Sequence, residues 1–220
     1  YYWRVHENSV AQNISAKSYA TTSGEAAVTE QLKRLGENIT VKSVINNIPI
    51  YRKYVSENKE MKIALVLWGA KKKEEYADIN EFIKTQDVIS EVHYCGENLA
   101  AEEINCIMET VETPWVWFIY GKGRIKSENL LNELSVYYER KDVATIDMKI
   151  VAADGTLLSG GCYLSGDSGM PVQIRCMGGP EDYAGYENAL LYNRVVSASL
   201  GYSTLVNVAI WRKDDKLRNE

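Results

Sequence analysis

The sequence lacks the features that mark membrane, secreted and zinc-binding proteins. It contains no run of about 18 apolar residues, so no membrane-spanning helix is expected. No secretory signal peptide is visible. The four cysteines include no C-x-x-C pair, which argues against a zinc site, and we expect them to be reduced and buried. These absences lead us to expect a cytoplasmic globular protein.

Charge and aromatic content exclude few classes of function. The 25 basic and 30 acidic residues give a net charge of −5, spread along the chain. This balance argues against a nucleic-acid partner held by bulk charge. Only two phenylalanines accompany fifteen tyrosines and five tryptophans. Aromatic rings with a polar group suit sugar-binding clefts, but they suit ordinary half-buried positions equally well.

Residues 1–60 differ from the rest of the chain. Thr22 and Glu25 have the spacing of a capping box, which predicts a helix that ends at Gly36. Its apolar stripe would consist of Val28, Leu32 and Leu35. Residues 39–55 are predicted to form a single extended segment. One helix and one strand cannot close a core, so we expect this region to pack on something else.

From Met61 onward, apolar strands and amphipathic helices alternate. We expect strands at residues 62–69, 88–95, 115–120 and 143–151, and helices around residues 76–83, 100–111 and 127–138, the last capped by Ser127. Alternation of this kind is typical of a mainly parallel sheet with helices on both faces, so the predicted fold class is α/β. A tight turn at residues 153–155 then begins a hairpin, and a last strand is expected at residues 202–211.

Four motifs follow the predicted sheet in a fixed order. They are Asp154-Gly155-Thr156, Gly160-Gly161, the G-P-E-D-Y-A-G-Y loop of residues 179–186 and the R-V-V-S-A-S-L-G segment of residues 194–201. In order and spacing they resemble the middle of the family 2 glycosyltransferases, which have the GT-A fold. The likeness is closest to bacterial polysaccharide and rhamnan-type enzymes. Residues 1–36 resemble another part of that family, the C-terminal end of a preceding transferase domain in tandem enzymes, through Trp3, Arg4, His6, Ser9, Lys17, Tyr19 and Ala20.

The resemblance implies a domain organisation and a function. Residues 1–60 would be the tail of a preceding glycosyltransferase domain and a linker, and residues 61–220 a GT-A-like domain that is degenerate or truncated. The parent protein would transfer a sugar from a nucleotide-diphosphate sugar to a growing bacterial surface polysaccharide, with a polysaccharide or lipid-linked glycan as acceptor. It would act in the cytoplasm, either free or at the inner face of the membrane. The alternative is a non-catalytic GT-A-like scaffold that binds a glycan or a partner domain.

The metal site of the family has no counterpart in the third strand. In the family this strand ends in a D-x-D pair whose carboxylates hold a divalent metal against the donor diphosphate. Here the matching residues are Tyr120-Gly121-Lys122-Gly123, and no acid lies between Trp115 and Arg124. Either Lys122 and Arg124 hold the phosphates in place of a metal, or the site has decayed and these residues form a solvated turn. No cofactor is therefore assigned to this chain, and Mn²⁺ or Mg²⁺ would act only in an upstream domain.

Four further residues are candidates for the donor and acceptor sides. Trp68 lies at the end of the first strand and either stacks on a uracil or thymine ring or simply packs there. Glu97 follows the second strand and is a candidate for a ribose hydroxyl. Asp182 and Tyr183 lie in the loop that borders the acceptor cleft in the family, and Asp182 is equally well explained as a turn residue.

No catalytic residue is assigned. An inverting transferase needs a carboxylate to accept the proton of the acceptor hydroxyl. The family supplies it after the final strand, where this chain has Asp214 and Asp215, and these lie too close behind the strand to match. His6 resembles a family histidine that assists metal or diphosphate binding, but it belongs to the preceding domain.

Overall fold

The chain forms two compact units, which are described separately. The computed structural model describes residues 18–45, 48–55, 60–121, 123–127, 129–138, 140–164, 172–174 and 176–213. Unit 1 draws on residues 1–58, 129–136 and 184–194, and unit 2 on residues 59–128, 137–183 and 195–220. The first change of unit, after residue 58, falls close to the expected boundary at residue 60. Unit 1 also takes in two later segments, which no linear boundary would include.

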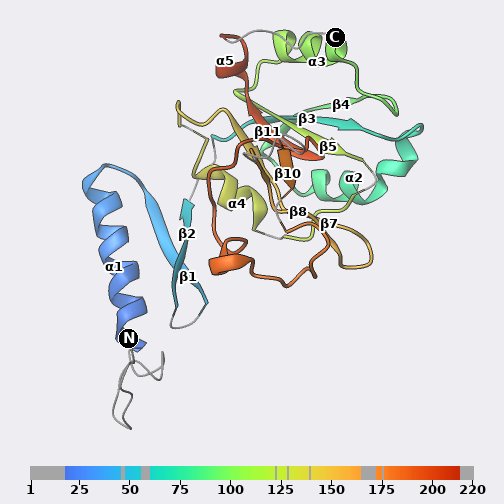
Figure 1. Ribbon diagram of the computed structural model, residues 1–220. Coiled ribbons are helices and arrows are strands. Elements are labelled where there is room, and N and C mark those ends of the chain that lie inside the picture. The colour runs from blue at the N-terminus through green and yellow to red at the C-terminus, as the bar shows by residue number, and fades with distance from the viewer. Residues whose placement is uncertain are drawn as a thin grey trace. The chain divides into compact units, whose positions relative to one another are not determined.

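Unit 1 is built on one helix and a two-stranded hairpin (Figure 1). Helix α1 (Ser18–Arg34) packs against strand β1 (Ile39–Ile45), which pairs antiparallel with β2 (Ile48–Val55). The expected single extended segment is therefore wrong, because the chain reverses between the two strands. The hairpin gives α1 a sheet on which to bury Leu32 beside Ile39 and Val41.

The two ends of α1 differ in how well the sequence predicts them. Gly36 has a φ of 80°, and the Glu37 N–H donates to the Leu32 carbonyl at 3.0 Å, so the predicted stop is confirmed. The predicted start is wrong, because the helix begins at Ser18 and Thr22 lies inside it. Leu35 is 63% exposed, so the predicted apolar stripe ends at Leu32.

A second helix of unit 1, α4 (Leu130–Ser135), packs on β2. Arg52 of β2 forms an ion pair with Glu133 at 2.9 Å and also donates to the Leu191 carbonyl at 3.3 Å. One guanidinium thus joins three distant parts of unit 1. The residue at the cap position of α4 is Asn129, so the predicted cap at Ser127 is wrong.

Unit 2 contains a five-stranded sheet with the order β4-β3-β5-β11-β6. The strands are β3 (Ile63–Trp68), β4 (Ile89–Tyr94), β5 (Trp115–Tyr120), β6 (Thr145–Asp147) and β11 (Ser203–Asn207). Strand β3 pairs parallel with β4 and β5, whereas β11 pairs antiparallel with β5 and β6. The α/β class is confirmed, and the sheet is mixed because β11 runs against its neighbours.

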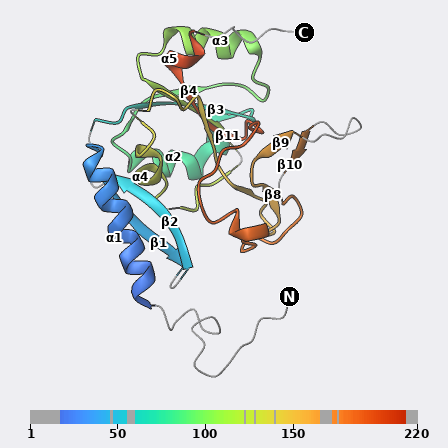
Figure 2. The same cartoon turned by 60° about the vertical axis from the view of Figure 1, so that its left-hand side comes forward.

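Helices cover both faces of this sheet, as expected (Figure 2). Helices α3 (Ala101–Thr110) and α5 (Val208–Trp211) share one face, and α2 (Ala77–Lys84), entered through a 3₁₀ turn at Lys73–Tyr76, lies on the other. The α3 face buries Ala64, Val66, Cys95, Ile107, Met108, Val111, Val116, Phe118, Val206 and Val208. On the α2 face the rings of Phe82 and Trp117 meet edge to face at 6.3 Å. The core of unit 2 therefore has two layers that share β3 and β5.

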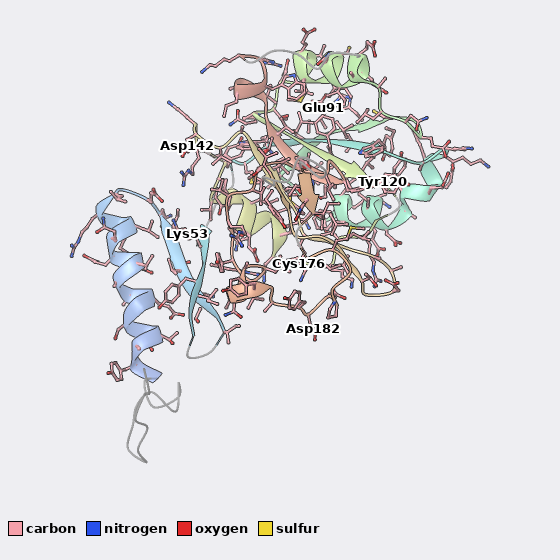
Figure 3. All side chains as sticks on the ribbon, in the orientation of Figure 1. Lys53, Glu91, Tyr120, Asp142, Cys176 and Asp182 are labelled. Atoms are coloured by element: carbon pink, nitrogen blue, oxygen red, sulfur yellow. The ribbon has the colours of Figure 1, made fainter. Side chains whose placement is uncertain are left out.

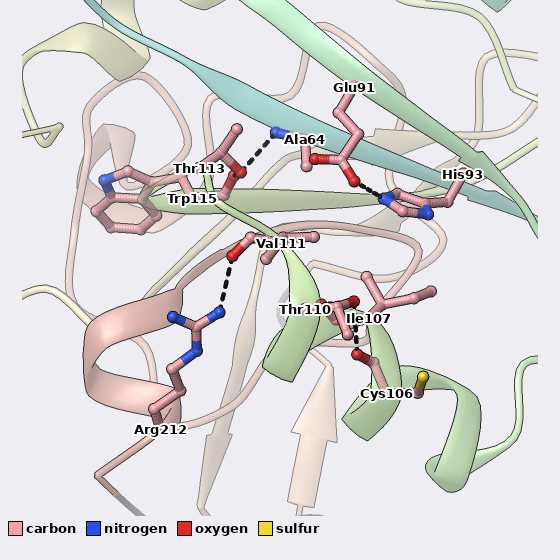
Figure 4. A network of polar contacts seen from close by, with 10 residues as sticks. All are labelled: Ala64, Glu91, His93, Cys106, Ile107, Thr110, Val111, Thr113, Trp115 and Arg212. Atoms are coloured by element: carbon pink, nitrogen blue, oxygen red, sulfur yellow. Dashed lines mark hydrogen bonds and ion pairs between the residues drawn. The ribbon is translucent and has the colours of Figure 1, made fainter.

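Polar contacts cap the C-terminal end of α3 (Figure 4). Arg212 donates to the carbonyls of Met108 at 2.9 Å and of Val111 at 2.7 Å, which satisfies groups that a helix end leaves free. The buried Thr113 hydroxyl accepts from the Ala64 N–H at 3.1 Å and donates to the Trp115 carbonyl at 3.0 Å. These bonds hold the loop before β5 against β3.

The later elements are shorter than expected. The predicted strand at 143–151 is wrong as one element, since β6 joins the main sheet and β7 (Ile150–Val151) forms a separate hairpin with β8 (Leu157–Ser159). The hairpin turn at residues 153–155 is confirmed. Strand β9 (Cys162–Leu164) pairs with β10 (Val172–Ile174).

The final predicted strand, residues 202–211, is also wrong over its second half. The Asn207 side chain accepts from the backbone N–H groups of Ala209 at 3.0 Å and Ile210 at 3.2 Å. Because an asparagine in this position caps a helix, the strand β11 stops there and α5 begins.

Gly121→Ala is expected to destabilise unit 2. A β-carbon at this position would overlap the buried ring of Tyr76, whose hydroxyl is fixed by a 3.1 Å hydrogen bond to the Cys95 carbonyl. Overpacking of this kind costs about 1–3 kcal/mol in free energy of unfolding, measurable by denaturant titration. Gly123→Ala is the matched control, because its β-carbon would meet only the Tyr120 carbonyl at 3.5 Å. Equal stability of the two variants would contradict the packing explanation.

Candidate ligand site at the carboxyl edge of the sheet

Three aromatic rings gather where β3 and β5 end and β11 begins. The Trp68 and Tyr120 rings meet edge to face at 5.0 Å, the Trp68 and Tyr202 rings stack at 6.5 Å with a 12° interplanar angle, and the Tyr120 and Tyr202 rings meet at 5.7 Å. Tyr202 is 42% exposed and the other two are half-buried. The carboxyl edge of an α/β sheet is a common place for ligands. The predicted residue Trp68 therefore belongs to an aromatic cluster at such an edge.

The glycines at this edge make room for aromatic rings. Gly69 has a φ of 93°, and a β-carbon there would overlap the Tyr120 ring. Gly121 has the same relation to Tyr76, and its N–H donates to the Trp68 carbonyl at 2.6 Å. Packing therefore explains why these two positions are glycine. Lys122 lies outside the described residues, as do His6, Asp214 and Asp215.

Arg124 and Glu97 lie in loops at the same edge. Arg124 is exposed and, together with Asp78, Glu81, Phe82, Thr85 and Ile125, lines a shallow cavity of about 340 Å³ beside α2. Glu97 is exposed and forms an ion pair with Lys71 at 3.4 Å. The Gly69 N–H donates to the Gly96 carbonyl at 3.0 Å, which brings the loop of Glu97 beside the end of β3. Glu97 and Arg124, both among the described residues, form no hydrogen bond or ion pair with each other.

Asp182 and Tyr183 are both exposed, as the position of Asp182 in Figure 3 also shows. The Tyr183 N–H donates to the Pro180 carbonyl at 3.0 Å, which closes a turn. Among the hydrogen bonds of the described residues, none is made by the Asp182 side chain, so its explanation as an amide-binding turn residue gains no support. Both side chains are available to a ligand.

Backbone contacts in unit 2 join the four motif segments in two pairs, partly through the residues directly beside them. The Leu157 N–H donates to the Gly179 carbonyl at 2.7 Å, and Thr156 forms a β-bridge with Pro180. The Cys162 N–H donates to the Ala198 carbonyl at 3.3 Å, and the Ser197 N–H returns a bond of 2.9 Å to the Cys162 carbonyl. The Asp154-Gly155-Thr156 turn is therefore joined to the start of the 179–186 loop, and the Gly160-Gly161 step is joined through its neighbour Cys162 to residues 197–198; we call these segments the motif assembly.

A charged cluster connects the loop after β5 to the same assembly. The Lys126 ammonium donates to both carboxylate oxygens of Glu181, at 2.8 and 2.7 Å. The Lys149 ammonium donates to the Glu181 backbone carbonyl at 2.6 Å. Lys126 first, and then the charges of Lys149 and Arg124, lower the pKa of Glu181 below its usual range. From the sequence, no site role was predicted for Lys126, Lys149 or Glu181, although Glu181 belongs to the 179–186 motif.

A second group that the sequence interpretation missed surrounds Asp147 at the end of β6. Its Oδ1 accepts from the hydroxyls of Ser199 at 2.7 Å and Thr204 at 2.9 Å, whereas Oδ2 is buried without a hydrogen-bond partner. Ser199 also accepts from the Gly201 N–H at 3.0 Å. The pairing of Asp147 with Thr204 places this group on the same sheet face as Phe118. It fixes the segment that leads into β11.

A cavity of about 400 Å³ lies between β4 and α3 and is lined by Lys73, Val92, His93, Tyr94, Cys95, Glu103, Cys106 and Ile107. The His93 Nε2 lies 2.5 Å from Glu91 Oε1 (Figure 4), and the His93 side chain is half-buried, with 29% of it exposed. Across the described residues, no three His, Cys, Asp or Glu side chains gather closely enough to hold a metal ion.

Asp147→Ala is expected to lower the free energy of unfolding by about 1–3 kcal/mol, because two hydroxyl groups lose their acceptor. Asp147→Asn keeps an oxygen for Ser199 and Thr204 and is the matched control, with an expected change of less than about 1 kcal/mol. Thermal and denaturant unfolding of both variants would test this. An alanine variant as stable as the asparagine variant would show that the hydroxyl network contributes nothing.

The cysteines are expected to differ sharply in reactivity. All four are free, but Cys106 is exposed, which corrects the expectation that all are buried. Burial, followed by a hydrogen bond with Glu103, raises the pKa of Cys95 to about 12. At pH 8 a thiol reagent should label Cys106 rapidly and Cys95 only after unfolding, because the thiolate is the reactive form. Peptide mapping would identify the labelled residues, and rapid labelling of Cys95 in folded Cys106→Ser protein would contradict this.

The comparisons with known proteins leave the family open. The sequence matches no protein-family model and no curated protein. The structure itself shows an α/β fold with a mixed five-stranded sheet. The likeness to family 2 glycosyltransferases stays a hypothesis that depends on the motifs.

Proposed function

We propose that this chain is part of a glycosyltransferase that takes sugar from a nucleotide-diphosphate sugar to extend a bacterial surface polysaccharide. The observation that carries the proposal is the assembly of the motif segments through the hydrogen bonds between residues 156–157 and 179–180 and between Cys162 and Ala198. The motifs share their order and spacing with the family 2 glycosyltransferases. Contacts between the segments would explain why that spacing matters. Their position after an α/β sheet agrees with a GT-A-like domain.

The donor would bind at the carboxyl edge of the sheet. The aromatic cluster of Trp68, Tyr120 and Tyr202 offers ring faces for a nucleobase or a sugar. Arg124 is exposed and free to pair with a phosphate oxygen, and Lys122 precedes it by two residues. Glu97 would have to leave Lys71 to reach a ribose hydroxyl. Donor binding of this kind uses cations of the protein and no D-x-D metal.

The catalytic base would come from outside the described residues. An inverting transfer needs a carboxylate beside the acceptor hydroxyl, and Asp182, although exposed, shows no contact that would tune it for this role. In this proposal the chain contributes donor and acceptor binding through Trp68, Arg124, Asp182 and Tyr183, and its own activity is weak or absent. The preceding transferase domain would supply the chemistry.

The second candidate function is that of a non-catalytic module that binds a glycan. It is favoured by the aromatic cluster, since stacked rings bind sugar faces without any phosphate chemistry. Exposed tyrosines at residues 163 and 183 add to the aromatic surface of unit 2. No described helix has the length and apolar character that a bilayer crossing demands.

Calorimetric titration with UDP, dTDP and GDP, each with Mn²⁺ and with EDTA, tests the first candidate. We expect one nucleotide to bind equally well under both conditions, because in this proposal Lys122 and Arg124 hold the phosphates in place of a metal. Lys122→Ala/Arg124→Ala should weaken that binding about tenfold or more, the value of one charge-assisted hydrogen bond.

The matched control is Lys33→Ala/Arg34→Ala, which removes the same two charges from the exposed end of α1. An equal loss of affinity in the control would show that binding depends only on net charge. Binding that requires Mn²⁺ would contradict the metal-free donor site. Failure of every nucleotide together with binding of an oligosaccharide would favour the glycan-binding module.

A further inference from the structure

The cluster of Lys126, Lys149 and Arg124 around Glu181 contains more positive charge than its acid neutralises. Both Glu181 carboxylate oxygens are bound by one cation, Lys126, in a bidentate contact. Lys149 binds the backbone carbonyl of the same residue, and Arg124 is close enough to lower the pKa of the Glu181 carboxyl. One cation thus binds the carboxylate, a second binds the backbone of the same residue, and a third, Arg124, lies two residues before Lys126 in the loop after β5.

The groups that contact Glu181 are of the kind that bind phosphate groups in proteins. An ammonium donating to two oxygens of one anion, with further cations beside it, is the usual environment of a bound phosphate or diphosphate. The Glu181 side chain is 45% exposed and that of Lys126 47%, so the pair lies at the surface, where water and a soluble anion can reach it. Exposed ion pairs of this kind are worth little, so an incoming anion can displace the carboxylate.

We propose that Lys126, Lys149 and Arg124 form a binding site for a phosphate or diphosphate group, and that the Glu181 carboxylate occupies this site when the ligand is absent. A diphosphate carries more charge than one carboxylate and would complement all three cations, whereas Glu181 neutralises only one. The site rests on the cluster geometry and deepens the proposed function, since it would be where the donor diphosphate lies. Binding at this site would not require a nucleobase on the ligand.

Displacement of Glu181 would have a structural effect. The Lys126–Glu181 pair ties the loop after β5 to the loop that carries Asp182 and Tyr183. When a diphosphate takes the place of the carboxylate, the 179–183 loop loses one of its attachments while the Lys149 bond to the Glu181 carbonyl can remain. Diphosphate binding would therefore release the side chains that border the acceptor position in the proposed function.

Isothermal titration with inorganic pyrophosphate at low ionic strength tests the site on the 220-residue chain. Wild-type protein should bind pyrophosphate, and Glu181→Gln should bind it about two- to fivefold more tightly, because the competing exposed pair is lost. Lys126→Met/Lys149→Met should weaken binding at least about tenfold. The controls are Glu37→Gln for the single variant and Lys33→Met/Lys42→Met for the double variant, which change the net charge by the same amounts at exposed residues of unit 1. Circular dichroism would confirm that each variant is folded.

Unchanged or weaker pyrophosphate binding by Glu181→Gln, or no binding by either protein, would overturn the proposal. Equal losses in Lys33→Met/Lys42→Met and Lys126→Met/Lys149→Met would do the same, since binding would then follow bulk charge. The result is distinguishable from that of the nucleotide titration. If the protein binds pyrophosphate but prefers no nucleotide, this site is upheld and the donor role is contradicted. If it binds a nucleotide and Lys126→Met/Lys149→Met leaves that affinity unchanged, the donor role is upheld and this site is contradicted.

Discussion

The burial of strand β3 on both faces is the constraint on which the rest of unit 2 depends. All five residues from Ile63 to Leu67 are fully buried, and each would lose about 1.5–3 kcal/mol of favourable transfer energy if exposed, except for the small Ala64. Such a strand must have a neighbour on each edge and a layer on each face. Strands β4 and β5 pair with its two edges, and helices α2 and α3 cover its two faces. The register of β3 with β5 then sets Trp68 opposite Tyr120 and so creates the aromatic cluster.

Packing and chemistry compete for the same few residues at the carboxyl edge. Gly69 and Gly121 are needed because Tyr120 and Tyr76 lie against their backbones, so packing alone explains these two glycines, whereas a β-carbon at Gly123 would meet only the Tyr120 carbonyl. The charged groups that do converge are Lys126, further along the loop after β5, and Lys149, between β6 and β7. The edge therefore separates into an aromatic part beside β3 and a cationic part beside the 179–183 loop. A nucleotide sugar presents the same two chemistries in one molecule.

The sequence predicted best those elements whose character is set by local apolar patterning. Strands β3, β4 and β5 and helices α2 and α3 were all found, because buried strands and amphipathic helices carry a signal within a few residues. Errors came where one polar residue redirects the chain, as Asn207 does by capping α5. The site followed the same division. Trp68 could be located from its place at the end of a strand, whereas Asp147 and Ser199, or Lys126 and Glu181, come together only through long-range pairing that no local pattern encodes.

The position of β11 within the sheet has a consequence for synthesis of the chain. This strand lies between β5 and β6, yet it is the last of the five to leave the ribosome. Until it arrives, β5 exposes a bare edge along Trp115–Tyr120, an apolar aromatic segment of the kind that recruits other chains. Strand β6 meanwhile has no neighbour within the sheet as described. The interval between translation of residues 120 and 207 is therefore when the nascent protein most needs a chaperone.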